Sequence, residues 1–157
     1  MSDSEENKRA AEKAMNLLLS QDRTRKELSD RLYRAGFSES AASYAISYVE
    51  SFGYIDDYRY ASNYLSFHKG DRSRKELRYK LMNKGVPTEI ISEVFMEYET
   101  EDELSALRRQ LMKKLRDRSL DEMEYKDREK VVAYLARKGY AVPMIRRVMQ
   151  EESGTCK

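Results

Sequence analysis

The side chains that could carry out catalysis are few and stand far apart along the chain. His68 is the only histidine, and Cys156, the only cysteine, stands next to the C-terminus. A single histidine excludes a histidine-based metal cluster and a Ser/His/Asp triad built within one chain. The sequence also contains neither a GxxxxGK[ST] loop nor a GxGxxG motif. We therefore expect no enzymatic activity, no metal site and no cofactor.

The remaining polar candidates are one carboxylate pair and several basic residues. Asp56 and Asp57 are adjacent, as in some glycosidase or metal sites, but a pair that caps the following helix is the favoured interpretation. Basic residues directly follow two predicted helix caps, where they oppose the helix dipole and hint at an external anionic partner. The candidate residues for binding a partner or DNA are Arg25, Lys26, Arg72, Arg74, Lys75 and Arg78.

Charge is clustered along the chain although the formal net charge is only +2. Residues 69–84 carry seven cations against two acids, and residues 108–118 carry six against one. Between them, residues 89–103 carry seven acids and no Lys or Arg. Solvated helix faces are the alternative interpretation. Patches of both signs favour a protein partner over a purely basic DNA-reading domain.

Aromatic residues are the second unusual feature, with 12 tyrosines in 157 residues. Tyr58, Tyr60, Tyr64 and Phe67 crowd one predicted helix. Aromatic rings can stack on single-stranded bases. Rings spaced four residues apart more often close a small core and keep the hydroxyl wet, and this core interpretation is favoured.

An internal repeat positions these residues. Gly36, Gly85 and Gly139 each follow a leucine by four residues and another apolar residue by eight, which predicts a helix that ends at the glycine. A second amphipathic helix follows each glycine. Twelve residues before the glycines stand three predicted N-caps, Thr24, Ser73 and Asp127, and the first two belong to capping boxes with Glu27 and Glu76.

A third helix precedes each cap, at about 6–20, 57–68 and 101–116. The sequence therefore predicts an all-α fold of three tandem three-helix, helix-turn-helix-like repeats that stack into an elongated, curved molecule. The expected segments are a flexible N-terminus (1–10), repeat one (11–53), repeat two (54–99), repeat three (100–152) and a flexible tail (153–157). The acidic N-terminus, lone cysteine and short apolar stretches indicate a cytoplasmic protein without a membrane segment.

Three parts of the chain carry motifs with a distinctive order and spacing. Residues 52–61 read FGYIDDYRYA, residues 70–77 and 84–86 read GDRSRKEL and KGV, and residues 134–140 read YLARKGY. These motifs resemble, in this order, the hallmark segment and the second and third repeat patterns of the RecX family of regulatory proteins. The likeness covers about residues 11–152, although Arg74 and Lys75 stand where the family often has an apolar residue.

The resemblance implies three tandem three-helix repeats and a regulatory role in DNA repair, recombination and the SOS response. Its members modulate, usually inhibit, the RecA recombinase by lying in the groove of the RecA–single-stranded-DNA filament, which represses strand exchange, ATPase and co-protease activities. Weak binding of single- or double-stranded DNA and a monomeric state are further expectations. Two alternatives remain: a helix-turn-helix DNA-binding regulator, and a helical scaffold for another protein.

Overall fold

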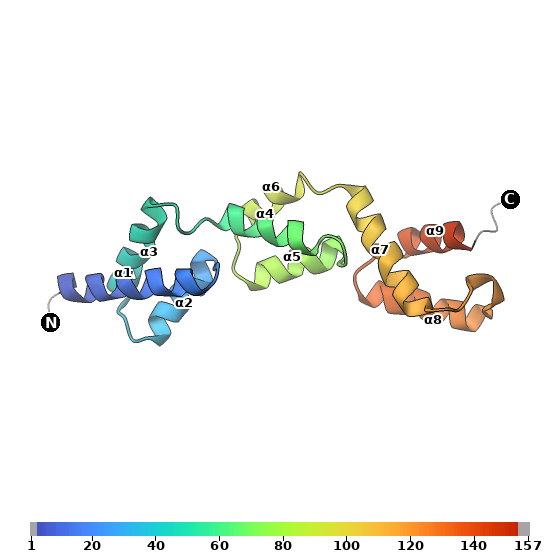
Figure 1. Cartoon of the computed structure of the whole chain (residues 1–157), viewed down its shortest axis with the longest axis horizontal. Coiled ribbons are helices and arrows are strands. Elements are labelled where there is room, and N and C mark those ends of the chain that lie inside the picture. Colours follow the sequence, from blue (N-terminus) through green and yellow to red (C-terminus); the bar gives the residue numbers. More distant parts are fainter. Residues whose placement is uncertain (1–2, 154–157) are drawn as a thin grey trace. The chain divides into compact units, whose positions relative to one another are not determined.

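The computed structural model describes residues 3–153, and within that range the chain forms nine α-helices, one short 3₁₀ helix and no strand (Figure 1). This confirms the predicted all-α repeat fold. The elements are α1 (Asp3–Ser20), α2 (Arg25–Arg34), α3 (Glu39–Ser51), α4 (Asp57–His68), α5 (Arg74–Asn83), α6 (Thr88–Phe95), α7 (Thr100–Leu115), η1 (Leu120–Glu122), α8 (Tyr125–Arg137) and α9 (Val142–Glu152).

The three repeat glycines end their helices as predicted. Gly36, Gly85 and Gly139 have φ values of 96°, 89° and 105°, in the left-handed region that favours glycine. The residue after each glycine donates its backbone N–H to the carbonyl of the leucine four residues before that glycine, at 3.1–3.3 Å. This bond belongs to the Schellman motif, which satisfies carbonyls left open at a helix end.

The helix starts follow the prediction in two of three repeats. Thr24 caps α2 in a complete capping box with Glu27. Ser73 Oγ accepts the backbone N–H of Glu76 at 3.1 Å and so caps α5. The prediction for Asp127 is wrong, because α8 begins at Tyr125 and Asp127 lies inside its first turn. A carboxylate there still interacts favourably with the helix dipole, so the residue type is explained without the capping role.

The chain divides into two compact units. The first contains residues 3–63 and 81–95, and its core brings together α1, α2 and α3. Alanines on α1 and α3, including Ala10, Ala14 and Ala45, are fully buried, and α1 packs most extensively on α3. Leu28 and Leu32 of α2 complete this core at the predicted helical spacing.

The second unit contains residues 64–80 and 96–153, and its largest core lies among α7, α8 and α9. Leu107 and Leu111 of α7 are fully buried against Leu135 of α8 and Ile145 of α9. These apolar positions at i and i+4 form the buried stripes of amphipathic helices. The three helices form one group at the C-terminal end of the chain (Figure 1).

Within the first unit, the start of α2 is joined to two later parts of the chain. Thr24 Oγ1, which accepts from Glu27, also donates to the carbonyl of Lys84 at 2.6 Å. Asp57, at the start of α4, accepts the backbone N–H of Arg25 at 2.8 Å. A Cβ built on Gly85 would overlap the side chain of Lys26, so the glycine allows this close approach.

The second unit repeats this joint with different residues. Ser73 Oγ donates to the carbonyl of Lys138 at 2.8 Å, next to Gly139. Glu103 of α7 accepts the backbone N–H of Arg74 at 2.9 Å. A Cβ on Gly139 would overlap Ser73 Oγ. Each joint therefore satisfies one open N–H of a helix start with a later carboxylate, and the hydroxyl at that helix start satisfies a carbonyl beside a later helix end.

We expect Thr24→Val to lower the free energy of unfolding by about 1–2 kcal/mol, because it removes both the helix cap and the bond to the Lys84 carbonyl. Valine keeps the shape of threonine and Thr24 is fully buried, so the decrease in the free energy of unfolding measures the contribution of the hydroxyl. The measurement is urea unfolding followed by circular dichroism. Thr24→Ser, which keeps the hydroxyl, is the matched control; equal losses in the two variants would contradict the assigned role.

The N-terminal helix starts earlier than the sequence predicts. The expected start was about Glu6, but α1 begins at Asp3 and includes the buried Ala10. Three acids in its first turn, Asp3, Glu5 and Glu6, favour a helix start there. Ser153 caps α9 at its C-terminus, whereas Cys156 lies outside the described residues.

Candidate partner-binding surface

The two predicted binding residues of the first unit lie at the start of α2. The Arg25 guanidinium pairs with Glu50 at 2.6 Å, and Lys26 Nζ pairs with Asp30 at 3.0 Å. Both side chains are more than half exposed. Exposed pairs of this kind contribute about 0–1 kcal/mol, so either cation can exchange its partner for an external anion at small cost.

Two predicted residues of the second unit flank the start of α5. Arg72 lies 3.6 Å from Glu76 and 3.9 Å from Asp71. The Arg74 guanidinium lies over the Tyr98 ring, 5.3 Å from its centroid. Cation–π contact fixes Arg74 in position without neutralising it.

The other two candidates, Lys75 and Arg78, continue along α5. Lys75 is exposed and Arg78 is half-buried. Residues 72–78 thus hold four of the six candidate cations, Arg72 just before α5 and the other three in its first turns. The binding role of all six remains a prediction.

The starts of α2 and α5 each receive a carboxylate from another part of the chain. Asp57 accepts the N–H of Arg25, and Glu103 accepts the N–H of Arg74. These carboxylates supply negative charge at both helix starts, where it is favourable. Burial raises the pKa of Asp57, an effect that the N–H and guanidinium of Arg25 oppose. Sequence spacing could not reveal either contact, because each joins residues about thirty positions apart.

The carboxylate pair has two separate roles. Asp56 Oδ1 accepts the N–H of Arg59 at 3.1 Å and caps α4, as predicted. Asp57 instead faces the start of α2. The pair therefore does not act as one capping unit.

The aromatic residues of α4 are less buried than the sequence suggests. Its buried residues include Ala61 and Leu65, whereas Phe67 is 83% exposed and Tyr58 is 37% exposed. The core prediction is therefore wrong for Phe67, because the apolar stripe of the helix passes through the smaller residues four positions apart. Phe67 lies edge-on to His68, with ring centroids 4.9 Å apart.

Two tyrosines of the second unit are buried, and the aromatic pattern of the sequence did not single out Tyr98. Tyr98 is 7% exposed and Tyr140 is 3% exposed. Burial raises the pKa of Tyr98 to about 12, and the carboxylates of Glu103 and Asp102 add to the effect. Burial also raises the pKa of Tyr140. The Tyr140 hydroxyl receives no hydrogen bond from the part of the chain that the structure describes.

We expect Tyr140→Phe to stabilise the fold by up to about 1 kcal/mol at pH 7, because it removes a buried hydroxyl without a bond. A tyrosine pKa raised by folding contributes stability below its ordinary value of about 10, which is lost as pH rises through the folded value. The variant should therefore gain more at pH 11. Thermal melts at both pH values test this, with the exposed Tyr79→Phe as control; a lower melting temperature for Tyr140→Phe would contradict it.

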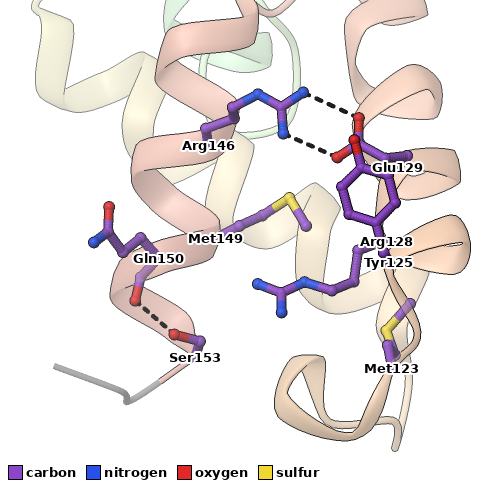
Figure 2. A pocket seen from close by; sticks show the side chains of 8 residues that line it. All are labelled: Met123, Tyr125, Arg128, Glu129, Arg146, Met149, Gln150 and Ser153. Atoms are coloured by element: carbon purple, nitrogen blue, oxygen red, sulfur yellow. Dashed lines mark hydrogen bonds and ion pairs between the residues drawn. The ribbon is translucent and has the colours of Figure 1, made fainter.

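A pocket of about 380 Å³ lies between α8 and α9 (Figure 2). Arg146 of α9 bonds both carboxylate oxygens of Glu129 on α8 at 3.0 Å. The hydrogen bonds from Arg146 lower the pKa of Glu129. Figure 2 shows the Arg128 side chain between the sulfur-bearing ends of Met123 and Met149. The bidentate pair fixes α8 against α9, a structural role that needs no ligand.

Among residues 3–153, no group of three or more His, Cys, Asp or Glu side chains could hold a metal ion. Over the same residues, no helix has the length and apolar character needed to cross a membrane.

Comparisons with known proteins match this arrangement of helices. The family model described as the first three-helix domain of RecX matches residues 10–48, and the model described as the third three-helix domain matches residues 101–149. The matched segments contain Gly36 and Gly139 with the helices on either side.

The named relatives and the solved structure that resemble this chain are also RecX proteins. The regulatory protein RecX of Chlorobium phaeobacteroides is 33% identical over 153 residues, covering 93% of this chain and 95% of that protein. The regulatory protein RecX of Clostridium botulinum Eklund 17B is 28% identical over 82% of this chain, which spans only 61% of that relative. The crystal structure of RecX from Lactobacillus salivarius matches with a TM-score of 0.82 and 24% identity over 94% of this chain and 97% of that chain, which supports the fold. The chain belongs to the RecX family of regulatory proteins.

Proposed function

We propose that this chain modulates, and in the main inhibits, the RecA recombinase. It binds in the groove of the RecA–single-stranded-DNA filament and represses strand exchange, ATP hydrolysis and co-protease activity. The observation that carries the proposal is family membership, through a relative 33% identical over almost the full length of both chains. The role is regulatory and non-enzymatic, and the protein works as a cytoplasmic monomer.

The repeated architecture supports a mechanism. The proposed repeats, 11–53, 54–99 and 100–152, each contact the filament weakly, and linked weak contacts bind far more tightly when all can engage together. A chain that spans neighbouring recombinase protomers favours the filament state it binds best, which shifts the population away from active, extending filaments. The cations at the starts of α2 and α5 contact acidic recombinase surface or DNA phosphate, and any binding to free DNA is weak.

The test is single-stranded-DNA-dependent ATP hydrolysis by the cognate recombinase, with this protein at well below one molecule per recombinase. Loss of most hydrolysis at that ratio supports a block of the filament, because sequestration could not reach most protomers. No effect at any ratio would refute the proposal and leave a helical scaffold for another protein as the function to pursue.

A further inference from the structure

A hollow of about 790 Å³ in the second unit is surrounded by basic side chains. It lies where the C-terminal end of α7 and the segment after it meet the C-terminal end of α8. Five cations line this basic hollow: Lys113, Lys114, Arg116, Arg118 and Lys138. Asp117 is the one acidic residue that lines it. Four of the five cations belong to the cation-rich segment 108–118 noted in the sequence.

The five cations differ from others in the same unit because they form no ion pair with any carboxylate within residues 3–153. Arg108, earlier on α7, pairs with Glu101 at 3.5 Å and with Glu151 at 3.4 Å. Like charges gathered around one concave surface create a strong local positive potential. That potential attracts a ligand that carries several negative charges.

Tyr134 holds two of the ammonium groups at the hollow. Lys114 Nζ lies 4.3 Å and Lys138 Nζ 5.3 Å from the centroid of its ring. A ring that already faces two ammonium groups stabilises them by cation–π contact. We therefore expect Tyr134 to position the lysines and not to stack on a base, which leaves charge as the recognised feature.

The backbone at Arg116 is strained. This residue, the C-cap of α7, has φ 56° and ψ −116°, and it is the one non-glycine residue with positive φ among residues 3–153. Such conformations are costly for a residue with a Cβ and cluster at functional sites. The turn at Arg116 ends α7 and leaves Arg116 and Arg118 beside the hollow. A glycine at position 116 would fit this backbone conformation but would supply no charge.

We propose that the basic hollow binds the phosphate backbone of single-stranded DNA without reading its bases. A phosphodiester chain carries one charge per nucleotide, so it can present several anions to five cations. A flexible single strand can bend into a concave recess, whereas a DNA duplex is too stiff to bend into a recess lined by a few side chains. This site is separate from the six cations predicted from the sequence, and its test does not require the recombinase.

The experiment measures fluorescence anisotropy of a labelled oligo(dT) with the full chain at several salt concentrations. The hollow variant is Lys113→Ala/Arg116→Gly/Arg118→Ala. We expect it to bind about tenfold or more weaker at low salt, with a salt dependence less steep by about 2 on the log–log plot. The matched control, Lys126→Ala/Lys130→Ala/Arg137→Ala, removes three exposed cations of α8 outside the hollow and should bind like the unmodified chain.

Arg116→Gly alone separates a binding role from a structural one. It removes a cation and relieves the backbone, so binding should weaken while the melting temperature stays equal or rises. The proposal is overturned if the hollow variant binds like the unmodified chain, or if the control loses as much affinity. It is also overturned if a duplex of equal length binds as tightly, or if an oligoglutamate of equal charge competes as well as oligo(dT).

Discussion

Replacing Gly85 by alanine is expected to lower the free energy of unfolding by about 2–4 kcal/mol. The backbone there has φ 89°, which penalises any residue with a Cβ. The new Cβ would also overlap Cβ, Cγ and Cδ of Lys26, so the start of α2 would have to move. Urea unfolding followed by circular dichroism measures the change.

Gly36→Ala separates the two causes. Gly36 has nearly the same φ, 96°, but a Cβ there meets no atom within 4 Å, so only the backbone penalty of about 1–2 kcal/mol applies. Adding Lys26→Ala to Gly85→Ala should restore part of the loss, because it removes Cγ and Cδ of Lys26 from the contact. If Gly36→Ala and Gly85→Ala lower the free energy of unfolding by the same amount, the overlap with Lys26 adds no cost, and the close approach at Gly85 does not require glycine.

The second large effect is expected on inhibition of the recombinase. Arg72→Ala/Arg74→Ala/Lys75→Ala removes three cations at the start of α5, and we expect half-inhibition of ATP hydrolysis to require about tenfold or more protein. The reason is that the surface ion pairs of Arg72, at 3.6 and 3.9 Å, contribute little, so this cation can exchange them for the anions of a partner at small cost, and that Lys75 is exposed. The measurement is hydrolysis by the cognate recombinase on single-stranded DNA, titrated with each variant.

Two comparisons make this result specific. The control with Lys126, Lys130 and Arg137 changed to alanine has the same net charge and should inhibit like the unmodified chain. Helical content and melting temperature must be checked for the α5 variant, because Arg74 lies over Tyr98. A folded α5 variant that inhibits at the original concentration would show that these three residues do not contact the partner.

The amino-acid sequence was sufficient to predict the helices and most of their ends. Leucines four residues before Gly36, Gly85 and Gly139 lie on buried helix faces, and each glycine takes the left-handed conformation. The cap at Thr24 was also predicted correctly. All of these features depend on residues at most a few positions apart, where helix geometry alone fixes which groups meet.

The groups from distant parts of the chain that complete those helix ends became known only from the fold. Asp57 and Glu103 serve helix starts about thirty positions earlier, and their sequence neighbours give no sign of it. The cations of the basic hollow come from the end of α7, from the segment after it and from the residue that follows α8, and their positions along the chain do not predict that they meet. Contacts of this kind follow from how amphipathic faces pack, so periodicity along one helix can locate a surface but cannot name its partner.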